Sequence, residues 1–553
     1  MSRTDQLAIF LSLLAILLAG LVTHYIFEGI PHLEDELAYV WQGRLLAEGK
    51  LSIPSPAHPK SFLVPFVIDY EGLRFGKYPP GWPLVMALGV LAGARWMVNP
   101  ILAGLGVWLT YLLGKRLFGP LTGLLAAALT LTSAFFLVNS GSLLSHPLGL
   151  VFSAAFALLW LAGFANHEQP PRWRYTIGAA LVMGFLILTR PFTAVGIALP
   201  FALHGIYRFF FPGKAGPWHR SPRTHLLVFG GIVLGLASLL FLWQYHLTGD
   251  PFLNPYTLWW EYDRVGFGEG IGVVPGGHTL HIARINLRQS LNAGWRDLFG
   301  WGGTSWLFLP FGVLAALKNW RGLLAGAVFP SLVFIHIFYW IGSELFGPRY
   351  YYEGLYSLTL FTALGISWLA GWLKQPGSSS DRVDSRPEAA TPDLFARLPS
   401  RFQRLAEPVR AHVNRLSSRA RGIFNHPKTL LGRNYLVPAL LVLLVYHNLF
   451  NFLPDRLWEM HALYTISRAD LQPFLTEEAQ ALTPALVIVH SERWMSYGAL
   501  IELEDPRLTT PFIFAWSRGP SADQALVDDF PNRKIYYYYV EEPGAFYTAP
   551  KDP

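Results

Sequence analysis

The sequence contains no cysteine, so a disulfide framework and a thiolate metal site are both excluded. Charged residues are also scarce: Asp, Glu, Lys and Arg make up 14% of the 553 residues, whereas soluble domains contain about 25%. Hydrophobic residues make up 52%. A chain of this composition is not soluble throughout, and we expect much of it to lie in a lipid bilayer.

Long apolar segments account for the hydrophobic excess. A spanning helix needs about 20 apolar residues, because a rise of about 1.5 Å per residue must cross about 30 Å of hydrocarbon. The first such segment, 7–27, has no small-residue cleavage site after it, so we expect a span and not a signal peptide. Further spans are predicted at 97–114, 121–138, 147–165, 175–189, 192–211, 226–245, 305–317, 323–341, 355–373 and 435–452. The predicted fold is an all-α polytopic membrane protein with about 11 transmembrane helices.

Basic residues occur in alternate loops, which predicts the orientation. The net charge is +7, and Lys and Arg accumulate in short cytoplasmic loops of membrane proteins. With a cytoplasmic N-terminus, four loops on that side share a single acid, Glu168, and contain Lys115, Arg116, Arg172, Arg174, Lys214, Arg220, Arg223, Lys318 and Arg321. We therefore expect the long loops 28–96 and 246–304 and the C-terminus to lie outside the plasma (inner) membrane.

The composition divides the chain into four regions. Residues 1–373 are expected to form the transmembrane domain, and residues 374–434, rich in Arg, Ser and Pro, a basic cytoplasmic linker on anionic lipid headgroups. This linker lacks a nucleic-acid-binding motif, so no nucleic acid partner is expected. After the last span, 435–452, β-rich runs at 486–490, 511–516 and 534–540 and a helical stretch near 522–529 predict a small exterior α/β domain in residues 453–553.

Three consecutive acids, Glu34, Asp35 and Glu36, follow the first predicted span. A solvated helix N-terminus would explain them, because carboxylates interact favourably with the helix dipole there. In a helix, successive side chains lie about 100° apart, so Asp35 and Glu36 cannot both point into one cavity. One would act as a base and the other as a support, and Tyr39 is a candidate lining residue of the same site.

A proline-rich motif follows at residues 75–83, Phe-Gly-Lys-Tyr-Pro-Pro-Gly-Trp-Pro. Proline lacks the backbone donor that a regular helix needs, so the motif predicts a turn into a helix at the membrane interface. A purely structural kink is the alternative interpretation.

These features together resemble the GT-C glycosyltransferases, and in particular the protein O-mannosyltransferases and the lipid A aminoarabinose transferases. The resemblance rests on one apolar span, the Asp35-Glu36 pair, a long exterior loop with a Pro-Pro element, and ten further spans, and covers roughly residues 1–373. Those enzymes pass a sugar from a polyprenyl-phosphate donor to an acceptor at the outer membrane face. The resemblance implies the same fold and the same class of reaction here.

The resemblance also implies roles for individual residues. Asp35 is implied as the catalytic base with Glu36 beside it, and Tyr78 takes the place of the His in the mannosyltransferases' His-Pro-Pro element. His146 stands where those families commonly have a further acid, and Arg190 corresponds to their cation for the lipid phosphate. From the residues alone, His146 could equally be a hydrogen-bond donor, a base, a metal ligand with Asp35 or a structural histidine at the head of a span.

The chemistry of such a transfer requires a base near the attacking hydroxyl and cations near the departing phosphate. Phosphate leaves as an anion, with a second pKa of about 6, so the second carboxylic acid of a glycosidase is not needed and direct displacement inverts the anomeric centre. The candidate phosphate-binding cations on the predicted exterior side are Lys77, Arg190, Arg296 and Arg349. Beside Arg349, Tyr350 and Tyr351 are candidate lining residues, although an interfacial aromatic belt with a snorkelling Arg explains that segment equally.

Several questions stay open from the sequence. No obligatory cofactor is expected, but a divalent cation held by Asp35 and Glu36 is not excluded, because hard cations bind carboxylate and phosphate oxygens together. A lipid or lipid-linked-sugar transporter or flippase would also have many spans and intramembrane charges, but would need neither the exterior acid cluster nor the exterior domain. A scaffolding membrane protein is a third class. Neither the sugar nor the acceptor, whether lipid, glycan or protein, can be read from the sequence.

Overall fold

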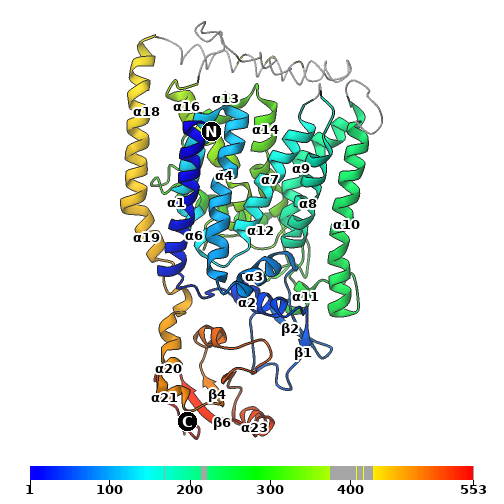
Figure 1. Cartoon of the computed structure of the whole chain (residues 1–553), viewed down its shortest axis with the longest axis vertical. Coiled ribbons are helices and arrows are strands. Elements are labelled where there is room, and N and C mark those ends of the chain that lie inside the picture. The colour runs from blue at the N-terminus through cyan, green and yellow to red at the C-terminus, as the bar shows by residue number, and fades with distance from the viewer. Residues whose placement is uncertain are drawn as a thin grey trace.

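The structure, a computed structural model, describes residues 1–166, 169–212, 221–373 and 427–551 and the single residues 407, 411 and 415. Long helices run side by side through most of the molecule, and a smaller unit of strands and short helices lies at one end of them (Figure 1). The predicted basic linker falls largely outside the described residues, as do Glu168, Lys214 and Arg220.

The helix bundle is built from apolar segments that pack on one another. Its central helix, α16, is buried over its first 13 residues, and one hydrophobic core joins it to the N-terminal helix α1 and to α4, α5, α7, α8 and α9. The helices of the bundle are α1 (Arg3–Tyr25), α4 (Val98–Phe118), α5 (Pro120–Leu131), α6 (Ala134–Gly141), α7 (His146–Phe164), α8 (Trp173–Thr189), α9 (Pro191–Phe210), α10 (Pro222–Thr248), α13 (Leu309–Ala316), α14 (Trp320–Gly326), α15 (Val328–His336), α16 (Leu355–Leu369) and α18 (Pro427–His447). The π-helical turn η5 (Asn448–Phe452) and α19 (Leu453–Trp458) continue α18.

Six helices of the described residues are long and apolar enough to cross a membrane, or seven if α5 and α6, which meet at 60°, form one bent span. They match seven of the predicted spans. The other four fall on shorter or interrupted helices: α8 has 17 residues, α16 has 15 and α13 has 8, and a break at Ala327 separates α14 from α15. The sequence pattern could not show these breaks, because the apolar runs continue through them.

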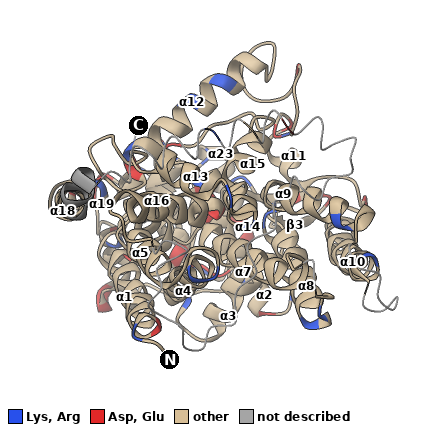
Figure 2. Ribbon diagram, turned by 90° about the horizontal axis from the view of Figure 1, so that it is seen from above, with Lys and Arg blue, Asp and Glu red and all other residues tan. Residues whose placement is uncertain are grey.

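Three basic residues at the end of the bundle farthest from the strand-containing unit contact neighbouring helices. The amine of Lys115 at the end of α4 lies 2.5 Å from the Asp5 carboxylate of α1, and Arg116 and Arg321 donate to carbonyl oxygens of Leu161 and Ala165. Seen along the bundle, most of the ribbon is neither acidic nor basic (Figure 2). Three of the basic residues that predict the orientation, Lys115, Arg116 and Arg321, therefore lie together at this end.

The first long loop folds into a compact layer under the opposite end of the bundle (Figure 1). An antiparallel sheet of order β1-β3-β2 pairs Val67 with Gly76, and its last strand leads directly into Lys77 and Tyr78. The elements of this layer are α2 (Glu34–Ala47), β1 (Ile53–Pro54), β2 (Val67–Tyr70), β3 (Leu73–Gly76), α3 (Gly81–Leu91) and η1 (Arg95–Met97). The interfacial helix expected after the Pro-Pro element is α3. The second long loop contains α11 (Pro255–Trp259) and α12 (Leu280–Asp297), and η3 (Arg349–Gly354) precedes α16.

The C-terminal unit has a parallel three-stranded sheet of order β5-β4-β6, which confirms the predicted small α/β unit. A shared hydrophobic core joins it to the first-loop layer, with Trp41 and Leu45 of α2 packed with Val487 and Phe514 of the sheet. Its elements are η6 (Leu463–Thr465), η7 (Arg468–Leu471), α20 (Gln472–Leu475), α21 (Glu477–Gln480), β4 (Ala485–His490), α22 (Trp494–Gly498), η8 (Ala499–Leu503), β5 (Phe512–Trp516), α23 (Pro520–Asp529) and β6 (Lys534–Tyr539).

Candidate active site

A cavity of about 700 Å³ lies between the bundle and the first-loop layer, where α2, α9, α11 and η3 meet. It brings together candidate residues that are up to 315 positions apart in the chain, and the candidates that line it are Asp35, Tyr39, Lys77, Tyr78, His146, Arg190, Arg349 and Tyr350. Three candidates, Glu36, Arg296 and Tyr351, do not line it.

Asp35, in the first turn of α2, presents its carboxylate to this cavity. The hydroxyl of Tyr78 donates a hydrogen bond to its Oδ1, and the Arg349 guanidinium lies 3.5 Å from its Oδ2. The side chain keeps 24% of its surface exposed. Asp35 is therefore oriented by two neighbours and still open to a molecule in the cavity.

Glu36 points the opposite way and is only 1% exposed. Its Oε2 accepts hydrogen bonds from the backbone N–H groups of His32 and Leu33, at 2.8 and 3.2 Å, and its Oε1 from that of Leu143, at 2.7 Å. Burial raises the pKa of Glu36 to about 7, although these three donors oppose the shift. Glu36 thus caps α2 and ties it to the turn before α7.

A metal chelated jointly by Asp35 and Glu36 does not fit this arrangement. The Glu36 oxygens face backbone donors away from the cavity, so the two carboxylates cannot share an ion there. Over the described ranges, no group of three His, Cys, Asp or Glu side chains is arranged as a metal-binding set. The arrangement of the two carboxylates therefore gives no support to a cation held by both.

Arg190 lies at the junction of α8 and α9, where Pro191 starts the new helix. Its Nε is 2.9 Å from Oε1 of Glu353, and its Nη1 donates to the Ser145 hydroxyl at 2.9 Å. A ring nitrogen of His146 lies 3.1 Å from the same Glu353 oxygen. Glu353, which the sequence reasoning missed, is fully buried and anchors both side chains.

Two glycines allow the close approaches that build this region. A Cβ at Gly149 of α7 would lie 2.7 Å from Cγ of Glu353, and one at Gly81 would lie 2.7 Å from the carbonyl carbon and oxygen of Leu188. Because glycine has no Cβ, Glu353 can pack on α7, and the start of α3 can pack on the end of α8 beside Arg190.

Neighbouring tyrosines of η3 face different surroundings. Tyr350 lines the cavity and stacks on His336, whereas Tyr351 packs edge-to-face on Phe329 in the hydrophobic core. Successive side chains of a 3₁₀ helix lie about 120° apart, so both cannot line one surface. Tyr351 is therefore a packing residue, and its predicted lining role is wrong.

Arg296 lies outside the cavity. Its Nε is 2.7 Å from Oδ1 of Asp297, and that carboxylate also pairs with Arg456 at 3.2 Å. The prediction of phosphate binding treated Arg296 as a free cation. In the structure, the guanidinium of Arg296 pairs with the buried carboxylate of Asp297, away from the cavity. The sequence does not show this pairing.

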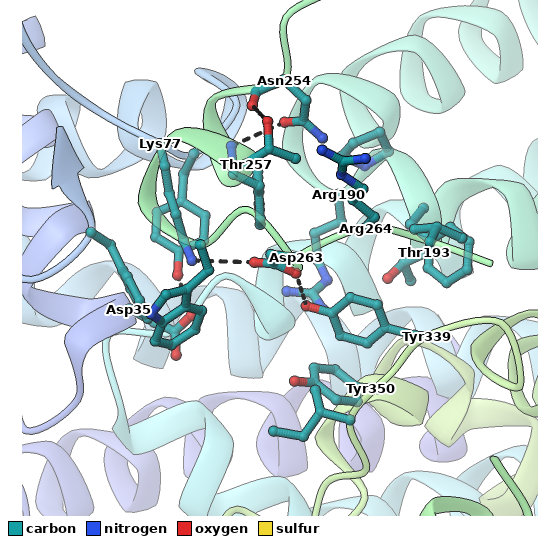
Figure 3. Close-up of a pocket in the computed structure, with 18 of the residues that line it drawn as sticks. Asp35, Lys77, Arg190, Thr193, Asn254, Thr257, Asp263, Arg264, Tyr339 and Tyr350 are labelled. Carbon is teal, nitrogen blue, oxygen red and sulfur yellow. Dashed lines mark hydrogen bonds and ion pairs between the residues drawn. The ribbon is translucent and has the colours of Figure 1, made fainter. Parts of the chain in front are cut away.

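The cavity also contains Asp263 and Arg264, which the sequence reasoning missed. Asp263 lies between Lys77 and Tyr339 (Figure 3), and its Oδ2 is 3.7 Å from the Lys77 amine. Arg264 lines the cavity, and its guanidinium has no ion pair or hydrogen bond with any residue that the structure describes. Their adjacent opposite charges, directly after the aromatic residues Trp259, Trp260 and Tyr262, are the pattern that could have indicated them.

The lining thus combines the cations Lys77, Arg190, Arg264 and Arg349 with the acids Glu34, Asp35 and Asp263. Burial lowers the pKa of Lys77 to about 8, an effect that the Asp263 carboxylate opposes. Aromatic rings flank these charges, among them Tyr39, Tyr256 and Trp260. Such a site can accept an anion and offer a carboxylate to a hydroxyl at the same time.

No protein-family model and no curated protein sequence matches this chain. Among solved structures it is similar to ArnT from Cupriavidus metallidurans bound to undecaprenyl phosphate, with a TM-score of 0.53 and 14% identity over 98% of this chain and 90% of that one. The chain therefore shares the fold of ArnT over nearly its whole length. This confirms the resemblance noted in the sequence.

Two further structures are similar. ArnT from the same organism in the apo state gives a TM-score of 0.51 at 15% identity, again over 98% of this chain and 90% of that one. The archaeal oligosaccharyltransferase AglB from Archaeoglobus fulgidus, in complex with an inhibitory peptide and a dolichol-phosphate, gives 0.49 at 11% identity over 95% and 69%. The ArnT likeness extends past residue 373, into the part of the chain that the sequence resemblance did not cover.

Proposed function

We propose that this protein is an inverting glycosyltransferase that moves a sugar from a polyprenyl-phosphate-linked donor to an acceptor hydroxyl at the outer face of the membrane. The observation that carries the proposal is the cavity, in which the open carboxylate of Asp35 lies among four basic side chains. The undecaprenyl phosphate bound to ArnT, whose fold this chain shares, supports a polyprenyl phosphate as the lipid of the donor.

In this proposal Asp35 is the base. It takes the proton of the acceptor hydroxyl while the hydroxyl oxygen attacks the anomeric carbon, and the bond between that carbon and the phosphate oxygen breaks with its electron pair moving to the phosphate. Arg190, Arg264 and Lys77 stabilise the departing anion by charge-assisted hydrogen bonds. Because the phosphate departs as an anion, no second acid is required.

The remaining candidates take supporting roles. Tyr78 and Arg349 orient the Asp35 carboxylate, and Tyr39 and Tyr350 provide aromatic faces for the sugar. His146 shares Glu353 with Arg190, which favours a role in holding that guanidinium over a role as a second base. Glu36 supports the site by fixing the start of α2.

We propose the orientation that the loop charges predict. Lys115, Arg116 and Arg321 lie at the end of the bundle opposite the cavity, so the positive-inside tendency places that end, with the N-terminus, in the cytoplasm. The cavity and the C-terminal unit then lie outside the plasma (inner) membrane. The predicted count of eleven spans requires the four shorter or interrupted helical segments to cross the bilayer inside the bundle.

The proposal is tested with the full chain in lipid nanodiscs, supplied with a panel of polyprenyl-phosphate sugars and hydroxyl-bearing lipid, glycan and peptide acceptors. Free polyprenyl phosphate, measured by mass spectrometry, should form with at least one pair and not with Asp35→Asn. Asp250→Asn is the matched control, because Asp250 is exposed in the second long loop and does not line the cavity. Transbilayer movement of a donor without any release of polyprenyl phosphate would contradict the proposal and identify a flippase.

A further inference from the structure

Lys77 is held in a cage of aromatic rings. Its amine lies 3.4 Å from the ring centre of Phe66 and 4.9 to 5.3 Å from those of Tyr78, Tyr256 and Trp260. Only 3% of the residue is exposed. Ring faces attract an ammonium ion electrostatically, and more strongly when water is excluded, so the cage holds the amine as a cation.

The rings of the cage provide no oxygen or nitrogen acceptor for the N–H groups of Lys77. The closest carboxylate oxygen, Oδ2 of Asp263, is 3.7 Å away, beyond the usual hydrogen-bond length of about 2.7–3.2 Å. Among the described residues, this long ion pair with Asp263 is the one contact of the amine with an oxygen acceptor. A buried ammonium with free donors beside a cavity is expensive unless a ligand completes its contacts.

Asp263 is itself fixed by two donors. The indole N–H of Trp340 donates to its Oδ1 at 3.0 Å, and the hydroxyl of Tyr339 donates to the same oxygen at 3.3 Å. Both donors therefore hold one carboxylate oxygen and leave Oδ2 turned to Lys77 (Figure 3). Asp263 is only 5% exposed, so its charge acts through a weakly screening environment.

The backbone conformation of Phe66 also indicates that the surrounding structure constrains the aromatic cage. Its φ of 62° lies in the left-handed region, which is unfavourable for a bulky side chain, yet it brings the closest ring to Lys77. Backbone strain of this kind persists only where the surrounding structure imposes it and clusters at functional sites.

We propose that Asp263 is a positioning residue: together with the aromatic cage it holds Lys77 as a charged donor whose free N–H groups receive the phosphate of the lipid-linked sugar. The inference rests on the proposed function for the identity of the anion, but not for the pairing itself. Other ionisable groups facing Lys77 are Asp35 and Glu34 from α2, its neighbour Tyr78, and Tyr256 from α11. Asp263 is the carboxylate closest to the amine, so its removal should have the largest effect on the charge of Lys77.

The test measures the charge of Lys77 directly, without a substrate. The full chain in nanodiscs is pulse-labelled with acetic anhydride, which reacts with neutral amines, across a series of pH values, and modification of Lys77 is quantified by mass spectrometry. The labelling midpoint should lie near pH 8 in the natural protein and lower by about one unit or more in Asp263→Asn, because an opposite charge at this distance raises the pKa of an amine by that amount. The exposed Lys60 provides the internal reference, and Asp250→Asn should leave the Lys77 midpoint unchanged.

A functional measurement completes the test and separates the two proposals. Asp263→Asn should shift the alkaline decline of kcat/KM for the donor to lower pH, and the double variant Asp263→Asn with Lys77→Arg should lose that decline, because arginine stays charged. A folded Asp263→Asn protein with an unshifted Lys77 midpoint overturns the inference even if transfer proceeds. A shifted midpoint in a protein that releases no polyprenyl phosphate with any donor overturns the proposed function instead, and with it the phosphate as the ligand of Lys77.

Discussion

The two ends of the helix bundle hold ionic groups in opposite ways. At the end with the N-terminus, Lys115 pairs with Asp5 while its side chain is 39% exposed, and such surface pairs contribute little to stability because solvent screens them. At the cavity end, Lys77, Asp263 and Glu353 are almost fully removed from solvent, where each ion costs several kcal/mol before its partners compensate. Charges kept at that cost point to a ligand, whereas the exposed charges at the other end agree with the membrane orientation that we propose.

The largest expected effect at the cavity end is on catalysis alone. Asp35→Asn removes the proposed base but keeps the size of the side chain, so we expect kcat to fall by about 10³-fold or more, while the Kd for the donor changes only a few-fold. Transfer assays and donor-binding titrations on the same preparation check this. A rate within tenfold of the natural protein would show that Asp35 is not the base.

Arg190 should affect both activity and stability. Arg190→Met leaves Glu353 buried without its closest cation, which should cost about 3–5 kcal/mol of unfolding free energy, and it should lower kcat/KM for the donor by about 10²-fold. The double variant Arg190→Met with Glu353→Leu should recover most of the stability and none of the transfer. Recovery of transfer in that double variant would show that Arg190 has only a structural role.

The pH dependence of transfer should come from Lys77, the cavity cation whose pKa is lowered. Burial moves the pKa of Lys77 from 10.5 to about 8, so its positive charge is present below that pH and is lost as the pH rises through it. The kcat/KM for the anionic donor should therefore decline above about pH 8 in the natural protein. In Lys77→Arg the decline should be absent. An identical decline in both proteins would assign it to another group.

Glu36 sharpens the comparison within the acidic pair. Glu36→Gln replaces one acceptor oxygen with an NH₂ group that faces a backbone donor, so we expect a loss of about 1–3 kcal/mol in unfolding free energy. The donor Kd of the folded protein should not change, because Glu36 does not line the cavity. Thermal unfolding checks the loss of stability, and a donor titration checks that the Kd is unchanged. Weakened donor binding with unchanged stability would show that Glu36 contacts the donor and does not act as a structural support.

The smallest effect is expected at the opposite end. Lys115→Ala breaks the exposed ion pair with Asp5 and should change the stability little, with no change in transfer. Thermal unfolding and the transfer assay check this. A loss of transfer without a loss of stability would mean that this end contributes to the reaction.

The part of the site that could be predicted from the sequence is the part carried by contiguous motifs. Asp35, Tyr78 and Arg190 each follow or precede an apolar run at a place where a charge or ring needs an explanation, and all three line the cavity. Helical geometry also predicted that Asp35 and Glu36 would separate, as they do. Asp263 and Arg264 were missed because their loop has no periodic pattern and their partners are far away in the chain.

The wrong predictions have the same origin in tertiary contacts. Arg296 looked like a free exterior cation, but Asp297 and Arg456 form one ionic cluster with it. The sequence predicted that Tyr350 and Tyr351 would both line the site, but in the 3₁₀ helix η3 only Tyr350 faces the cavity. In the fold, the number of long helices was overestimated because hydropathy does not register the short lengths of α8, α13 and α16 or the break between α14 and α15.

The most direct test of the central claim is the structure of the protein with a non-transferable phosphonate analogue of its donor and an acceptor. The account predicts that the Asp35 carboxylate lies within about 2.6–3.2 Å of the acceptor hydroxyl, on the side of the anomeric carbon opposite the phosphonate, with Arg190, Arg264 and Lys77 around the phosphonate. A carboxylate on the phosphonate side, or one turned away from the sugar into solvent or lipid, would contradict it.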